Sequence, residues 1–174
     1  MRPIIAAAIA ALLAACSSAP QAAPTPPHAE PAPGTVAYDR DVWTDLLDTH
    51  DAIHRSVKHI DGGVEAVTES DDPAVAAKIK DHAFAMQRRM KEGLRVRQWD
   101  PLFVALFDRH DAITLVVVET EKGVSIRETS SDPEVVALLQ AHAAGVDAMV
   151  REGFSASRVE TPMPPRQAAP ANGG

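Results

Sequence analysis

The sequence predicts a mainly α-helical domain in which an α-β-α unit occurs twice. The two units would form a four-helix bundle with a small two-stranded antiparallel ribbon, related by a pseudo-twofold axis. Three observations support this prediction: the sequence repeats at a shift of sixty residues, apolar residues recur with helical spacing, and Asp-Pro pairs mark helix starts. With 45% hydrophobic and 24% charged residues in 174, the chain has the composition of a folded protein.

The repeat can be read directly from the sequence. The tetrapeptide His-Asp-Ala-Ile occupies residues 50–53 and again 110–113, and Gly63, His82 and Gly93 each have an identical residue sixty positions later. So many matches without a gap indicate a duplicated unit. We therefore assign residues 39–98 to the first repeat and 99–158 to the second. Together they supply enough chain for one domain with a single core.

Each repeat is predicted to begin with an amphipathic helix, starting at Trp43 in the first copy and at Phe103 in the second. Glycines end these helices, and two short segments of alternating polarity follow, residues 64–68 and 124–128. Because isolated strands need a partner, we expect these two segments to pair with each other in an antiparallel ribbon. Asp72-Pro73 and Asp132-Pro133 then begin a second helix in each copy, which ends at Gly93 or Gly153.

The segment from Ile113 to Val118 conflicts with this assignment. It is β-branched and apolar almost throughout, and propensity alone favours a buried strand. The matching segment 53–58 fits an amphipathic helix, so the repeat favours a helix in both copies. We adopt the helix and interpret the surplus apolar residues as a contact between two copies of the chain.

The N-terminal residues indicate the compartment. A basic start at Arg2 precedes an apolar run from Ile4 to Ala15, which is too short to span a bilayer and predicts a signal peptide over residues 1–15. The run ends Leu13-Ala14-Ala15-Cys16, which resembles the lipobox of bacterial lipoproteins. The resemblance implies that Cys16 is lipidated, and Ser17 after it implies anchoring on the periplasmic side of the outer membrane. Residues 16–38, rich in Pro and Ala, would form a tether, and residues 159–174 a disordered tail.

Charge and cysteine content restrict the partners. A net charge of −7 argues against nucleic-acid binding, which needs a basic face. Cys16 is the only cysteine, so the chain cannot form an internal disulfide. Motifs for a serine or cysteine nucleophile are also missing, and we expect no enzyme activity. The remaining partners are the membrane through the lipid anchor, and a protein partner or a second copy of the chain.

Histidines are the strongest functional signal in the sequence. His50 and His82 recur as His110 and His142, and all four are predicted on apolar helix faces that meet inside the bundle. The first copy adds His54 and Met86 at helical spacing from this pair. Imidazole together with a thioether suits copper, because soft sulfur selects Cu(I). The sequence thus predicts a copper-like metal site, with haem as the second choice, for storage, delivery or sensing.

The alternative is a structural lipoprotein without a ligand. A histidine on an apolar stripe is commonly a core residue that hydrogen-bonds a neighbouring carbonyl or carboxylate. In that interpretation the repeated His-Asp-Ala-Ile segment is a signature of the fold, and the helices dock a protein partner.

Overall fold

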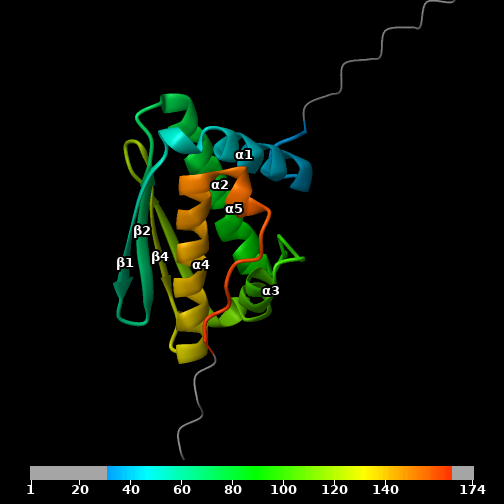
Figure 1. Ribbon diagram of the computed structural model, residues 1–174, viewed down its shortest axis with the longest axis vertical. Helices are drawn as coiled ribbons and strands as arrows, with labels where there is room; N and C mark the ends of the chain where they lie inside the picture. The colour runs from blue at the N-terminus through cyan, green and yellow to red at the C-terminus, as the bar shows by residue number, and fades with distance from the viewer. Residues whose placement is uncertain (1–30, 166–174) are drawn as a thin grey trace, which may run out of the picture.

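The computed structural model describes residues 31–165 and shows an antiparallel sheet with helices on one side (Figure 1). The first half contains α1 (Val36–Asp48), the 3-10 turn η1 (His50–Ala52), β1 (His54–Ile60), β2 (Gly63–Glu69) and α2 (Pro73–Glu92). The second half repeats this order with α3 (Pro101–Asp108), η2 (His110–Ala112), β3 (Thr114–Glu119), β4 (Gly123–Thr129) and α4 (Pro133–Glu152), followed by α5 (Phe154–Ser157). The signal peptide, Cys16 and most of the predicted tether lie outside the described residues.

The predicted four-helix bundle with a two-stranded ribbon is wrong. The structure has a four-stranded antiparallel sheet in the order β1-β2-β4-β3. The first helix of each repeat ends at Asp48 or Asp108, and the residues assigned to its second half form β1 and β3. Segments 64–68 and 124–128 do pair antiparallel, but as the two inner strands of the larger sheet.

The physical reason for this error lies in the periodicity of residues 53–58. Along β1 the half-buried Arg55 and Val57 alternate with the exposed His54, Ser56 and Lys58, which is the period of two that a strand requires. The β-branched run of β3 alternates in the same way, with Leu115 and Val117 facing inward. The strand propensity of residues 113–118 therefore indicated the correct structure. The prediction failed because residues 53–58 were assigned to a helix and the repeat was used to assign 113–118 in the same way.

The long helices begin and end where the sequence indicates. Asp72 and Asp132 are the N-caps of α2 and α4, and their side chains accept hydrogen bonds from the backbone of Ala74 and Glu134. A proline occupies the first turn of each helix, where its missing N–H costs nothing. Gly93 and Gly153 end the helices with positive φ angles.

The long helix of each half packs on the strands of the other half. α2 follows β2 in the chain but packs mainly on β3 and β4, whereas α4 packs on β2 and β1. α1 then lies against α2, and α3 against α4, on the side of the helix layer away from the sheet. Each repeat therefore covers the strands of the other, and neither could bury its own hairpin alone.

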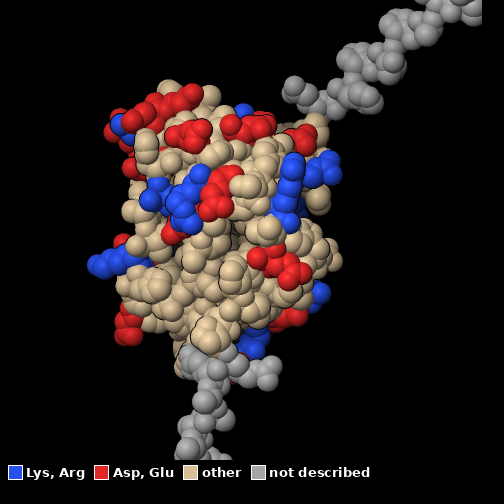
Figure 2. Space-filling view, in the orientation of Figure 1, with Lys and Arg blue, Asp and Glu red and all other residues tan. Residues whose placement is uncertain are grey.

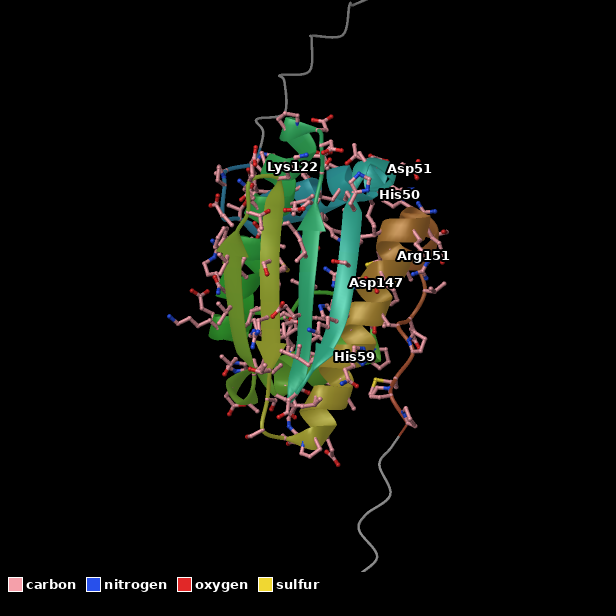
Figure 3. All side chains as sticks on the ribbon, turned by 90° about the vertical axis from the view of Figure 1, so that its left-hand side faces the viewer. His50, Asp51, His59, Lys122, Asp147 and Arg151 are labelled. Atoms are coloured by element: carbon pink, nitrogen blue, oxygen red, sulfur yellow. The ribbon has the colours of Figure 1, made fainter. Side chains whose placement is uncertain are left out.

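The other face of the sheet is open (Figure 3). No described helix covers it, and it carries polar residues such as Lys58 and Arg127, as is common for antiparallel sheets. Val116 and Val118 on the edge strand β3 are 46% and 56% exposed. The contact between copies that the sequence suggested for this segment would lie here. Within residues 31–165, no helix combines the length and apolarity needed to cross a membrane.

Candidate ligand cavity

A cavity of about 900 Å³ lies between the inner face of the sheet and the helices. Its walls come from α1, α2, α4, the inner residues of the strands, and the loop before α3. Protein interiors are packed as densely as organic crystals, so a void of this size is not ordinary packing imperfection. The volume lies within the range of pockets that bind small molecules and cofactors.

Helices α2 and α4 form two opposite walls of the cavity, and they do so with equivalent positions. Four lining residues on each helix are related by the sixty-residue shift. They are His82, Met86, Arg89 and Met90 on α2, and His142, Val146, Met149 and Val150 on α4. The pseudo-twofold arrangement therefore brings His82 and His142 to the same cavity, as the sequence suggested for this pair.

Both cavity imidazoles lack part of their hydrogen bonding. The Nδ1 atoms of His82 and His142 are buried and have no partner among the described residues. Burial lowers the pKa of each imidazole to about 4, so both are neutral at neutral pH. The ring of Phe103 meets the ring of His142 edge to face, with centroids 5.1 Å apart. A buried polar atom without a partner is costly to the fold.

The sheet adds a buried acid to the cavity wall. Glu128 on β4 is buried, and the loss of solvation raises its pKa to about 7, although the positive charge of Arg55 acts in the opposite direction. Arg55 itself donates to Asp147 Oδ1 over 2.8 Å and to Thr68 Oγ1 over 2.7 Å. Glu128 can therefore change its charge near neutral pH. Sequence reasoning missed it, although Val124, Ile126 and Glu128 share one face of a strand.

The loop before α3 contributes Arg97, which sequence reasoning also missed. Its φ of 46° makes it the only residue other than glycine with a positive φ in the described part of the chain. Its guanidinium lies over the rings of Trp99 and Phe103, 4.4 and 4.9 Å from their centroids. The side chain is 10% exposed and pairs with Asp100, yet its buried Nε has no partner among residues 31–165. Strained and unpaired groups of this kind often mark functional sites.

The other predicted histidine ligands, His50, His54 and His110, do not lie together on the cavity walls. His50 lies in η1 at the edge of the cavity, and its Nδ1 is 2.9 Å from the backbone oxygen of Val150, near the end of α4 (Figure 3). His110 lies in η2 against Gly93, at the end of α2. His54 is on β1, and its side chain is 70% exposed, 4.0 Å from Asp71.

The predicted copper set of His50, His54, His82 and Met86 is therefore divided between two sides of the sheet, and the helix that was to align it ends before His50. Within residues 31–165, no group of three or more His, Cys, Asp or Glu side chains has the geometry of a metal site. Of the six predicted ligands, His82, Met86 and His142 line the cavity walls, His50 reaches the cavity edge, and His54 and His110 lie elsewhere.

Comparison of the chain with protein-family models, with curated proteins and with solved structures found no significant match. The assignment of a function therefore depends on the cavity itself. Apolar side chains form the larger part of its lining, with methionines on both helices, and the polar residues include His82, His142, Glu128 and several arginines. Such a lining suits a molecule that is mostly apolar and carries a few hydrogen-bonding atoms.

Proposed function

We propose that this chain is a ligand-binding lipoprotein that holds a largely apolar small molecule in the cavity between its sheet and its helices. The observation that carries this proposal is the cavity of about 900 Å³ lined by two half-buried imidazoles, His82 and His142, whose Nδ1 atoms have no hydrogen-bond partner among residues 31–165. A ligand in this cavity would bury apolar surface against its lining, which is the main source of affinity for a largely apolar molecule.

The role we propose is storage or delivery rather than catalysis, at the periplasmic side of the outer membrane. This location depends on the resemblance of Leu13-Ala14-Ala15-Cys16 to a lipobox. A lipid anchor on Cys16 would keep the cavity close to a membrane that could donate or receive an apolar molecule.

Haem is a second candidate, and one observation favours it over copper. His82 on α2 and His142 on α4 both line the cavity, so their imidazoles could together hold a haem iron. Methionines on the same helices would suit the apolar faces of a porphyrin. A copper ion alone would leave most of the volume unfilled.

The test is to identify what the full-length exported protein carries. Organic extraction followed by mass spectrometry reports an apolar ligand, and an absorption spectrum reports haem. We expect a bound molecule in near-stoichiometric amount. If it is haem, its Soret band should disappear in His82→Ala/His142→Ala, whereas an apolar ligand without metal should give no such band.

A matched pair of variants on α4 locates the binding. Val146→Trp fills the cavity, and Ala144→Trp places the same ring on the exposed side of the same helix. Val146→Trp should weaken binding of a neutral fluorescent probe, N-phenyl-1-naphthylamine, by at least roughly tenfold, a loss of the size expected when apolar burial is removed. Ala144→Trp should leave binding unchanged. Equal binding by both folded variants would contradict the proposed function.

A further inference from the structure

The walls of the cavity carry more positive charge than the rest of the molecule suggests. Although the chain has a net charge of −7, only two acids line the cavity, Asp39 and Glu128. The arginines that line it number six: Arg40, Arg55, Arg89, Arg95, Arg97 and Arg158. Arginines therefore outnumber acids in the lining of the cavity, although the whole chain is acidic.

Four of these arginines are held by carboxylates. The pairs are Arg55 with Asp147, Arg89 with Asp39, Arg95 with Asp108, and Arg97 with Asp100. Three of those carboxylates, on Asp147, Asp108 and Asp100, do not line the cavity themselves. Arg89 neutralises Asp39, and the raised pKa of Glu128 keeps that side chain largely protonated in slightly acidic solution. An anion inside the cavity would thus meet little repulsion.

The other two arginines are not held in this way. The nearest carboxylate oxygen to Arg40 is Asp41 Oδ1, at 4.0 Å, and the Arg40 side chain is 70% exposed. Arg158 lies over the ring of Phe154, 5.5 Å from its centroid, and forms no ion pair within the described part of the chain. Figure 2 shows basic side chains beside the N-terminal half of α1, the segment that contains Arg40.

These arginines surround one aromatic cluster at the rim. Trp43 and Phe154 both pack on the cluster formed by Leu47, Phe103 and Met149. Arg40 lies one helical turn before Trp43, Arg158 stacks on Phe154, and Arg97 stacks on Phe103 with its Nε unpartnered. Arg40 and Arg158 are therefore the exposed guanidinium groups near this cluster, whereas Arg97 is 10% exposed and already donates to Asp100 and to the backbone oxygen of Ser157.

We propose that the ligand is an anionic amphiphile, with an apolar chain inside the cavity and a carboxylate or phosphate head at this rim beside Arg40 and Arg158. This inference rests on the proposed function, because it names the class of molecule that the cavity takes. Guanidinium groups bind carboxylates and phosphates through charge-assisted hydrogen bonds, whereas a neutral alcohol gains less and an amine is repelled.

The experiment compares the affinities of four twelve-carbon ligands that differ only in their head group. The full-length protein is loaded with N-phenyl-1-naphthylamine, which is neutral, and the probe is displaced by dodecanoate, dodecyl phosphate, dodecanol and dodecylammonium. Either anion should bind at least roughly tenfold more tightly than dodecanol, since one hydrogen bond to a charged group is worth about that factor. Dodecylammonium should bind most weakly. The two anions together show whether a carboxylate or a phosphate fits better.

Two double variants show where the preference arises. Arg40→Gln/Arg158→Gln should lose most of the preference for the anions while binding of dodecanol stays unchanged, which also shows that the variant is folded. Arg127→Gln/Arg151→Gln removes the same charge outside the cavity lining and should keep the preference. Equal displacement by dodecanoate and dodecanol would overturn this inference and leave the proposed function standing, whereas failure of the probe to bind at all would overturn both.

Discussion

The two halves of the molecule agree in their scaffold and differ in their polar interior. Positions that build the core match across the sixty-residue shift: Leu46 and Leu106 are both buried, and so are Val64 and Val124. The buried Asp39–Arg89 ion pair of the first half has no counterpart, because Trp99 and Met149 occupy its positions in the second. Duplication has kept the packing and changed the charges.

The same contrast appears on the inner face of the sheet. Arg55 lies opposite Thr68 in the first hairpin, whereas Leu115 lies opposite Glu128 in the second. The cavity therefore has two similar halves with different electrostatics, even though His82 and His142 occupy equivalent places. A ligand with an apolar body and one polar end would bind such a cavity in a single orientation.

The largest loss of stability should come from breaking the Asp39–Arg89 ion pair, which only the first half has. Arg89 Nε donates to Asp39 Oδ2 over 2.8 Å, and both side chains are buried. Arg89→Met, which installs the residue of the second half, leaves a buried carboxylate without its main partner and should cost about 3–5 kcal/mol of the free energy of unfolding. Urea denaturation measures this cost.

Replacement of both partners is the matching control. Asp39→Leu/Arg89→Met removes the two charges together, and most of the lost stability should return, because a buried ion pair contributes little net energy. If the single and double variants were equally unstable, the packing of Arg89 rather than its charge would explain the effect.

A change of intermediate size in the free energy of unfolding should follow the pH, through the titration of Glu128. An unfolded glutamate loses its proton near its ordinary pKa of 4.5, whereas folding raises the pKa of Glu128 to about 7. Between these values the unfolded state binds fewer protons than the folded state. The free energy of unfolding should therefore fall as pH rises from about 4.5 to 7, by about 3 kcal/mol in total from this group.

The variant Glu128→Gln isolates this contribution. Its stability relative to wild type should increase across the same pH interval, as measured by urea denaturation at several pH values. The cavity histidines act in the opposite direction, because their pKa of about 4 makes the protein gain stability between pH 4 and 6.5, and they cancel in the comparison. Glu160→Gln on the exposed chain after α5 should show no such trend. A flat difference for Glu128→Gln would mean that Glu128 is ionised throughout.

The sequence allowed the repeat, the caps of the long helices and the pairing of residues 64–68 with 124–128 to be predicted. These features depend on local signals such as Asp72-Pro73, or on a match between two segments. The four-stranded sheet could not be predicted in the same way, because residues 53–58 fit both a helix and a strand. Only the burial of Arg55 and Val57 on the face of β1 that α4 covers decides between the two periods.

The site was predicted only in part, for a related reason. His82 and His142 were placed correctly in one interior, since their helices were identified correctly. His54 was paired with His50 through a helix that ends before it. Arg55 was assigned to that same helix, and Glu128 was not singled out although its strand was expected. The face of a strand that is buried depends on which helix covers it, and here the covering helices come from the other repeat.

The smallest effect on stability should separate His50 from His110, the repeated histidines of the two 3-10 turns. His50 Nδ1 is 2.9 Å from the backbone oxygen of Val150, whereas the structure gives His110 no such bond among residues 31–165, only packing against Gly93. His50→Ala should therefore lower the free energy of unfolding by about 1 kcal/mol more than His110→Ala, the net value of one hydrogen bond. A Cβ on Gly153 would fall 2.5 Å from His50 Cδ2, so Gly153→Ala should cost less in the His50→Ala background than in wild type. Equal costs for the two histidine variants in urea denaturation would mean that the repeated segment stabilises both helix ends by packing alone.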